Sequence, residues 1–236
     1  MSLERQTRLR PLRRAMLVGM AAVGVDVAVA AALTRRVRAE EITHVRRDSE
    51  RVGAENAAGD LQRAVLHEED SANPDGLSFA GTAAWTAETV PARANRPSET
   101  VVRADVVIPD RQLTLKWTLR RNDDRALPAS HTIELIFALP PNFSHRGIQS
   151  VPGVLAKKSE QMRGVPLQGS AAKVTAGYFL IGLSALARAG NIELLKRVPW
   201  FDVPIVYDDG RRAILAFEKG IVGERAFDEV FAAWDQ

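Results

Sequence analysis

The stretch that decides the fold is residues 101–139, which read VVRADVVIPDRQLTLKWTLRRNDDRALPASHTIELIFAL. Apolar and polar side chains alternate in three runs, at residues 101–108, 113–120 and 132–139. A period of two with one apolar face is typical of antiparallel strands that are half covered by a core. The turn-forming sequences Pro109-Asp110 and Asn122-Asp123-Asp124 separate the runs. We therefore expect three successive strands that form a meander.

The same texture continues on both sides of this stretch. Further candidate strands are residues 63–67, 80–90, 176–184, 203–207 and 212–217. Asp208-Asp209-Gly210 lies between two of them, and Asp-Gly between apolar runs is a strong hairpin signal. Residues 151–169 are rich in Gly and Pro and are interpreted as a long surface connection, with a binding lip as the alternative. We predict a mainly β body, either a β-sandwich or a partly open antiparallel barrel.

Two helices are expected beside the strands. Asn191 is placed to N-cap a short internal helix that stops at Pro199. A C-terminal amphipathic helix is predicted over residues 224–234. Its apolar side chains recur at i, i+3, i+4 and i+7, namely Phe227, Val230, Phe231 and Trp234. Such a stripe can cover one face or edge of the sheet.

Composition and charge narrow the class of protein. The chain has 236 residues, of which 46% are hydrophobic and 26% charged, as is ordinary for a packed core. Cysteine is absent, which excludes disulfides, thiolate metal sites and a cysteine nucleophile. Residues 1–38 hold eight Arg against two acidic residues, whereas the remainder holds 24 basic and 27 acidic side chains. Because the body is mildly acidic, it lacks the basic surface that nucleic acid needs, and no such partner is predicted.

The N-terminal charge brackets an apolar run of nineteen residues, 15–33, which reads AMLVGMAAVGVDVAVAAAL. As a helix it extends for about 28 Å, close to the hydrocarbon thickness of a bilayer. We expect a transmembrane helix or signal anchor. A cleaved export signal, supported by Arg13-Arg14 and small residues near Ala30, and a buried soluble helix are the alternatives. Asp26 costs about 2.5–3.5 kcal/mol near mid-bilayer and is interpreted as a tolerated polar residue rather than a proton-sensing one.

The arginines around this run also predict its orientation. Five Arg precede it and three follow it, so the positive-inside rule leaves the N-terminus in the cytoplasm. The predicted organisation is a basic cytoplasmic tail (1–14), a membrane helix (15–33), a charged stalk or linker (34–60) and a β-rich extracytoplasmic domain (61–236). We expect a single-pass protein of the inner (cytoplasmic) membrane with a periplasmic body, and the lipid bilayer as the partner of residues 15–33.

Motifs that carry chemistry are few. The sequence has no nucleophile elbow, no phosphate-binding loop, no dinucleotide-binding glycine pattern and no H-E-x-x-H zinc motif. Its histidines do not pair at metal-ligand spacing; they are His44, His67, His131 and His145. No catalytic residue, metal or cofactor is therefore predicted, and a protein other than an enzyme is favoured.

The densest polar cluster surrounds the second turn of the meander. It comprises Arg120, Arg121, Asn122, Asp123, Asp124, His131 and Glu134. As a binding site it would recognise an anion or a sugar, with Arg as the bidentate donor. The favoured interpretation is a solvated loop with local ion pairs and an Asx turn. His131 begins the apolar face of residues 133–137, so it is interpreted as a hydrogen-bonded histidine at the edge of the core.

Six short words carry a resemblance to a known family. They are RAVLHEED at 63–70, IPDR at 108–111, LPASHT at 127–132, WFDVP at 200–204, EKG at 218–220 and GERAF at 223–227. On these words, residues 63–236 resemble a family of uncharacterised alphaproteobacterial proteins that are membrane-tethered or exported and have a variable N-terminal region. The resemblance implies no activity, so no catalytic residue is carried over from it.

The expected function is that of a membrane-anchored cell-envelope protein, a noncatalytic binding or structural module with an envelope protein or a glycan as its partner. One alternative is an envelope hydrolase that acts on a glycan or peptide, with polar groups near Asp123, Asp124, His131 and Glu134. Another is a regulatory subunit of a membrane complex. Paired carboxylates about 5–10 Å apart in a deep cleft would favour the hydrolase. A shallow surface with scattered polar groups would favour the module.

Overall fold

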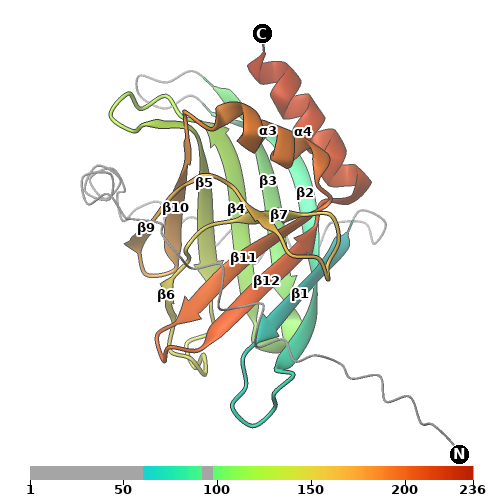
Figure 1. Cartoon of the computed structure of the whole chain (residues 1–236), viewed down its shortest axis with the longest axis vertical. Helices are drawn as coiled ribbons and strands as arrows, with labels where there is room; N and C mark the ends of the chain where they lie inside the picture. The colour runs from blue at the N-terminus through green and yellow to red at the C-terminus, as the bar shows by residue number, and fades with distance from the viewer. Residues whose placement is uncertain (1–60, 92–97, 236) are drawn as a thin grey trace, which may run out of the picture.

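The computed structural model describes residues 61–91 and 98–235. Within these residues, one antiparallel sheet of 12 strands curls into a half-barrel, and two α-helices accompany it (Figure 1). The strands are β1 (Gln62–Glu68), β2 (Leu77–Val90), β3 (Glu99–Ile108), β4 (Leu113–Arg121), β5 (Ala129–Ala138), β6 (Ile148–Ser150), β7 (Leu155–Lys157), β8 (Val165–Pro166), β9 (Gly169–Thr175), β10 (Tyr178–Ser184), β11 (Trp200–Tyr207) and β12 (Arg212–Glu218). The helical elements are the 3-10 turn η2 (Pro109–Arg111), α3 (Arg188–Arg197) and α4 (Gly220–Trp234).

The prediction of a mainly antiparallel β body with an internal and a C-terminal helix is confirmed. The tail, membrane helix and stalk predicted over 1–14, 15–33 and 34–60 lie outside the described residues. Within the described ranges, no helix has both the length and the apolar character needed to span a membrane.

The strand order is β8-β7-β11-β12-β1-β2-β3-β4-β5-β10-β9, with β6 paired to β11. β3, β4 and β5 form the predicted meander, in which Leu119 lies opposite both Val102 and Ile133. β11 and β12 form the predicted hairpin, and Gly210 adopts a φ of +83° in its turn. β1 pairs with β2 on one side and β12 on the other. The early and late strands therefore belong to one curled sheet rather than to two stacked ones.

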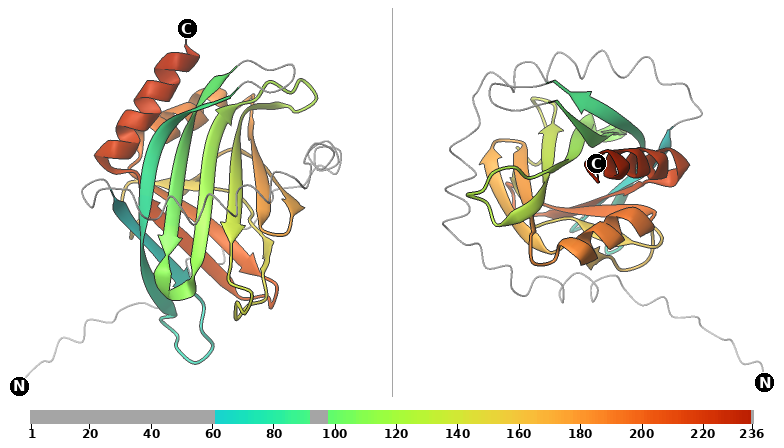
Figure 2. Two further views of the ribbon diagram at one scale, coloured as in Figure 1. Left: turned by 180° about the vertical axis from the view of Figure 1, so that it is seen from behind. Right: turned by 90° about the horizontal axis from the view of Figure 1, so that it is seen from above.

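Alternation along the strands sends one set of side chains to the concave face of the sheet. In β4, Leu115, Trp117 and Leu119 are fully buried there. α4 packs on β2 and β3, and the end-on view in Figure 2 shows it within the curl of the sheet. Its Phe227 meets Trp85 with 5.5 Å between ring centroids. The predicted stripe is confirmed, because α4 buries Phe227, Val230 and Phe231 and partly buries Trp234.

The internal helix differs from its prediction at the N-terminus. α3 begins at Arg188, and Asn191, the predicted N-cap, is buried inside the helix. The Asn191 amide exchanges two hydrogen bonds of 2.8 Å with the backbone N–H and C=O of Gln168. The capping prediction is wrong because this side chain satisfies the backbone of another segment instead of its own helix. At the other end, the buried Lys219 ammonium donates to the Lys196 carbonyl at 2.7 Å, where a cation is favourable to the helix.

Residues 151–169 are more than the predicted surface connection. They supply the short strands β7 and β8 at one end of the sheet. Val151, Val154 and Leu167 are buried in the core. The interpretation as a surface connection is therefore wrong. These strands are only three and two residues long, too short for an alternating pattern to be recognised.

The strands of the half-barrel end at two rims. The upper rim comprises residues 121–131, 184–188 and 231–235, which lie at the top of Figure 1. The lower rim comprises residues 109–112, 140–147 and 207–210, with Glu68 at the end of β1, and lies at the bottom. Polar side chains gather at both rims, but in different ways.

Candidate functional site

The upper rim holds a cavity of about 510 Å³. Its lining consists of Arg121, Asn122, Ser130, His131, Ala185 and Arg188. Strand pairing explains why part of this set converges, since Arg121 at the end of β4 lies opposite His131 in β5. The connection from β10 to α3 brings in Ala185 and Arg188. Three separate segments of the chain therefore build one open site.

The predicted polar cluster divides between the two faces of the sheet. Three of its members line the cavity, namely Arg121, Asn122 and His131. Arg120 lies one residue from Arg121 and so points to the opposite face, where its guanidinium contacts Glu99 at 3.4 Å and Glu134 at 3.3 Å. Glu134 lies opposite Thr118, a register that places it away from His131. Asp123 and Asp124 belong to the loop and are outside the cavity lining.

Asn122 is occupied by its own loop. Its side-chain nitrogen donates to the carbonyls of Asp124, Leu127 and Ala129 at 3.0, 3.2 and 2.8 Å. Its side-chain oxygen accepts from the Asp124 backbone N–H at 3.1 Å, and the Asp124 carboxylate in turn accepts from the Ala126 N–H at 3.0 Å. These are Asx-type contacts that fix the loop without a ligand. Asn122 therefore shapes the wall of the cavity.

His131 lies at the boundary between the core and the cavity. Its side chain is buried, and its ring packs on Trp234 with 5.1 Å between centroids. Nδ1 shares a hydrogen bond of 3.0 Å with the Ser130 hydroxyl. Burial, with smaller effects from Arg188 and Arg121, lowers the pKa of His131 to about 4. The imidazole is consequently neutral at pH 7, so the positive charge of the cavity comes from its arginines.

The two arginines of the cavity are exposed side chains from different elements. Arg121 donates one hydrogen bond of 3.3 Å to the carbonyl of Trp234 near the end of α4. Arg188 is the first residue of α3. Among residues 61–91 and 98–235, neither guanidinium takes part in a salt bridge, and no carboxylate is part of the cavity lining. The site is thus electropositive.

The lower rim holds a second polar cluster, which we call the lower-rim network: Glu68, Arg111, His145, Tyr207 and Asp209. The Glu68 carboxylate is buried and accepts a hydrogen bond of 2.6 Å from the Tyr207 hydroxyl. Arg111 binds both carboxylate oxygens, at 3.2 and 2.7 Å. His145 lies between two acids, with Nε2 at 3.6 Å from Glu68 and Nδ1 at 2.7 Å from Asp209. Each charged group of the network therefore has a partner.

The sequence does not predict this network as a cluster, because its members come from four separate segments: β1, η2, the 140–147 segment and the β11–β12 hairpin. One feature of the sequence does point to the lower-rim network. Glu68 continues the inward face of Ala64 and Leu66 in β1, and a carboxylate at a core position predicts a buried partner.

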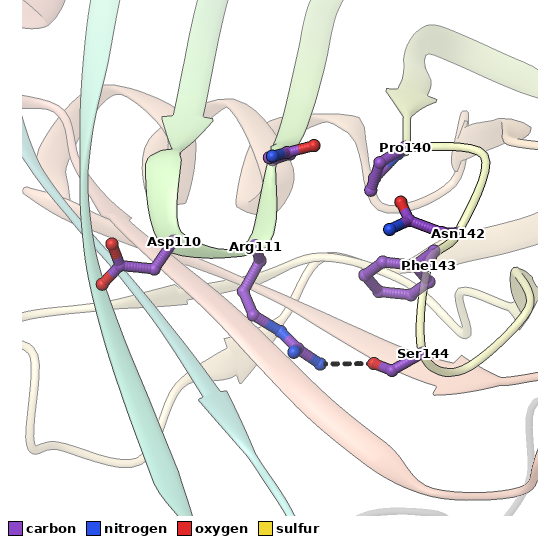
Figure 3. Close-up of a pocket in the computed structure, with 7 residues that line it drawn as sticks. Asp110, Arg111, Pro140, Asn142, Phe143 and Ser144 are labelled. Atoms are coloured by element: carbon purple, nitrogen blue, oxygen red, sulfur yellow. Dashed lines mark hydrogen bonds between the residues drawn. The ribbon is translucent and has the colours of Figure 1, made fainter.

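A cavity of about 200 Å³ borders the lower-rim network and shares Arg111 with it. Its lining is Asp110, Arg111, Gln112, Pro140, Asn142, Phe143 and Ser144. Figure 3 shows Arg111 reaching across it to Ser144, to which Nη2 donates at 3.1 Å. The same guanidinium lies 4.9 Å from the ring centroid of Phe79 and 5.5 Å from that of Phe143. Arg111 is thus held on several sides by its own protein, which leaves it poorly placed to bind a ligand.

The lower-rim network is also an unsuitable metal centre. Glu68 and Asp209 contact opposite nitrogens of His145, so the two carboxylates and the ring do not converge on one point. Within the part of the chain that the structure describes, no group of three or more His, Asp or Glu side chains is placed to hold a metal ion. A scan against protein-family models, a search of curated proteins and a search of solved structures each give no match.

Proposed function

We propose that this chain is a membrane-anchored cell-envelope protein whose β-rich body is a noncatalytic binding module, with the upper-rim cavity as its ligand site. The observation that carries the proposal is the convergence of Arg121, Ser130, His131 and Arg188 on one open cavity. The anchor rests on residues 15–33 of the sequence. Membership of the alphaproteobacterial family of tethered or exported proteins is part of the same proposal.

Binding is favoured over hydrolysis by how the polar groups are arranged. A glycan hydrolase of the usual kind needs two carboxylates that face each other across the substrate. The cavity lining contains none, and Glu134 and His131, two of the groups considered for a hydrolase, lie on opposite faces of β5. His131 is neutral and its Nδ1 shares a hydrogen bond with Ser130, its neighbour on the same strand. Among the residues that the structure describes, no third side chain hydrogen-bonds to the His131 ring to orient it as a catalytic base. A rigid scaffold with an open, polar cavity suits recognition.

The anchor and its orientation are tested on the full chain in cells. The chain should remain with membranes after high-salt and alkaline washes, because burial of an apolar helix survives both. A reporter that is active only outside the cytoplasm, fused after Gln236, should be active. Release of the full-length chain into the soluble fraction, or an abundant but inactive fusion, would contradict the anchor or its orientation respectively.

The binding role is tested on the purified full chain in detergent, by thermal shift against cell-wall glycans, peptides, phosphates and carboxylates. A ligand at hundredfold excess over its dissociation constant stabilises the folded state by about 2.7 kcal/mol. We expect at least one class to raise the melting temperature, and the variant Ser130→Trp, which places an indole ring in the cavity, to reduce that shift. Cleavage of a glycan or peptide by the purified chain would favour the hydrolase instead.

A further inference from the structure

The charge of the upper-rim cavity narrows its ligand. Two guanidinium groups border it, and its other lining residues are Asn122, Ser130, His131 and Ala185, none of which carries a negative charge. Both arginines disfavour the charged form of His131, which places that ring within their positive field. A cationic ligand would be repelled by the two arginines, and an uncharged ligand would gain no electrostatic attraction from them. An oxyanion would be attracted by both guanidinium groups.

Hydrogen-bond donors remain available for such a group. A guanidinium carries five N–H donors, and Arg121 spends one on the Trp234 carbonyl. For the Arg188 side chain, the described residues provide no hydrogen-bond acceptor or ion-pair partner. Ser130 adds a hydroxyl, which contacts His131 Nδ1 at 3.0 Å and the Leu183 carbonyl at 3.5 Å. This hydroxyl can donate to an anion when Nδ1 carries the imidazole proton and donates to the Ser130 oxygen. Two planar forks and one hydroxyl match the geometry of carboxylate and phosphate oxygens.

The size of the cavity indicates more than a bare ion. A volume of about 510 Å³ lies within the range of small-molecule sites, roughly 300–1,000 Å³. Phosphate or a carboxylate alone would occupy a small part of it. The anionic group is then the head of a larger organic molecule.

We propose that the upper-rim cavity binds the carboxylate or phosphate group of a small organic anion between Arg121 and Arg188, with Ser130 as a further donor. This inference rests on the proposed binding function and specifies its ligand class. Asn122 fixes the loop, and His131 forms the uncharged floor against which the rest of the ligand packs.

The same chemistry has two sources, a soluble organic anion and a lipid head group. Leu186, between the lining residues Ala185 and Arg188, is fully exposed, with a relative accessibility of 102%. A single exposed leucine is common on protein surfaces. It nevertheless offers an apolar contact beside the cavity for the hydrocarbon chain of a lipid-like anion. The dependence of affinity on chain length therefore distinguishes the two sources.

The experiment measures affinity by calorimetry, using the full chain in phosphatidylcholine nanodiscs at fixed ionic strength. The probes are benzoate and phenyl phosphate, with benzamide as the uncharged analogue. We expect the two anions to bind and benzamide to bind at least about tenfold more weakly. Arg188→Gln should weaken binding of the anions by about tenfold or more. Arg188→Lys should weaken it by less, because lysine keeps the charge but lacks the planar fork. The control is Arg125→Gln, in the loop between β4 and β5 but outside the cavity lining, which should weaken binding by less than about twofold.

Arg121→Gln is a second variant, although it also removes a contact to α4, so Arg188→Gln is the cleaner test. Methyl phosphate and hexyl phosphate then distinguish the sources. A gain in affinity with chain length that Leu186→Ser removes identifies a lipid-like anion, and equal affinities identify a soluble one. Unchanged anion affinity in Arg188→Gln, or benzamide binding as well as benzoate, would overturn the inference while leaving a binding function in place. Failure of every ligand class in the thermal-shift screen would instead count against the proposed function itself.

Discussion

The two rims of the half-barrel end the same strands but treat their polar side chains in opposite ways. At the lower rim, Glu68 is 4% exposed and its carboxylate is shared among Tyr207, Arg111 and His145. At the upper rim, Arg121 and Arg188 border an open cavity, and their guanidinium groups keep most of their donors. The charged groups of the lower-rim network are therefore paired with one another, whereas the arginines of the upper rim keep donors that a ligand can use.

The difference follows from what covers each rim. The 140–147 segment folds over the lower rim and places Phe143 and His145 against Tyr207, whose ring stacks on His145 at 4.4 Å between centroids. Once water is excluded, a buried carboxylate must be paired, because an unpaired one costs several kcal/mol. At the upper rim, Arg121 and Arg188 are exposed to water and do not need a buried partner. Paired groups therefore indicate a structural role, and solvated, converging groups indicate a ligand site.

The largest expected effect is at the centre of the lower-rim network. Glu68→Ala leaves Arg111 and the Tyr207 hydroxyl without their shared partner in a buried site. We expect the free energy of unfolding to fall by about 3–5 kcal/mol, the usual result of removing one member of a buried ion pair. Denaturant unfolding measures it. Glu193→Ala, which breaks the exposed pair with Arg197, is the control and should cost less than about 0.5 kcal/mol. Equal effects of the two changes would show that the lower rim is solvated.

A smaller loss is expected at the hydroxyl of Tyr207. Tyr207→Phe keeps the ring that stacks on His145 but removes the 2.6 Å hydrogen bond to Glu68. Hydrogen bonds to charged groups contribute about 1.5–3 kcal/mol, and we expect a loss of that size. Combining Tyr207→Phe with Glu68→Gln in a double-mutant cycle isolates the pair. A coupling energy indistinguishable from zero would mean that Tyr207 is held by packing alone.

The sequence pattern predicts most of the fold and part of the upper-rim cavity, but it does not predict the lower-rim network. The alternation in residues 113–119 and 133–137 was visible because half of those side chains enter one core. The short strands β7 and β8 left no such pattern. Part of the cavity lining is predictable, because Arg121, Asn122 and His131 lie close together in the sequence. Arg188 is distant in the sequence, so its place in the cavity is not predictable. Arg120 and Glu134 lie on the other face of the sheet, which the two-residue period of a strand already predicts.

The contributions of the two rims to folding stability should also change over different ranges of pH. The pKa of His131 is about 4 in the folded protein against 6.5 ordinarily, so below pH 6.5 the unfolded chain binds the extra proton and stability falls until about pH 4. Solvent at the open cavity reduces the effect to an expected loss of about 1–2 kcal/mol. At the lower rim, the hydrogen bond from His145 lowers the pKa of Asp209, so its contribution is lost only as pH falls below 3.8.

Unfolding measured across these two ranges, in the full chain and in His131→Phe, checks the assignment. The variant should show a smaller decline between pH 6.5 and pH 4, where the remainder comes from His67, whose pKa burial also lowers. It should keep the decline at lower pH. NMR titration of Arg188→Gln should show a higher pKa for His131, because a positive neighbour has been removed. A decline that persists unchanged in His131→Phe would place its origin elsewhere in the molecule.

The smallest expected effect on stability is at the upper rim. Neutralising Arg121 and Asp124 together, as Arg121→Gln and Asp124→Asn, should change the free energy of unfolding by about 0–1 kcal/mol, because Arg121 is exposed and Asp124 is only half-buried. The asparagine keeps an oxygen that can accept from the Ala126 N–H, so the turn is preserved.

Asn122→Ala in the same loop should lower the free energy of unfolding by more, about 1–3 kcal/mol, since three carbonyls lose their shared donor.

Ligand stabilisation should show the reverse order, and this contrast separates a solvated turn from a binding site. An organic anion that raises the melting temperature of the unaltered chain should raise it less in the Arg121 and Asp124 double variant, although that variant is nearly as stable. A tenfold weaker affinity lowers the ligand contribution from about 2.7 to about 1.4 kcal/mol at a concentration that is hundredfold above the original dissociation constant. If the double variant keeps the full shift, the arginine of this loop does not contact the ligand, and residues 120–125 are a solvated turn, as their sequence first indicated.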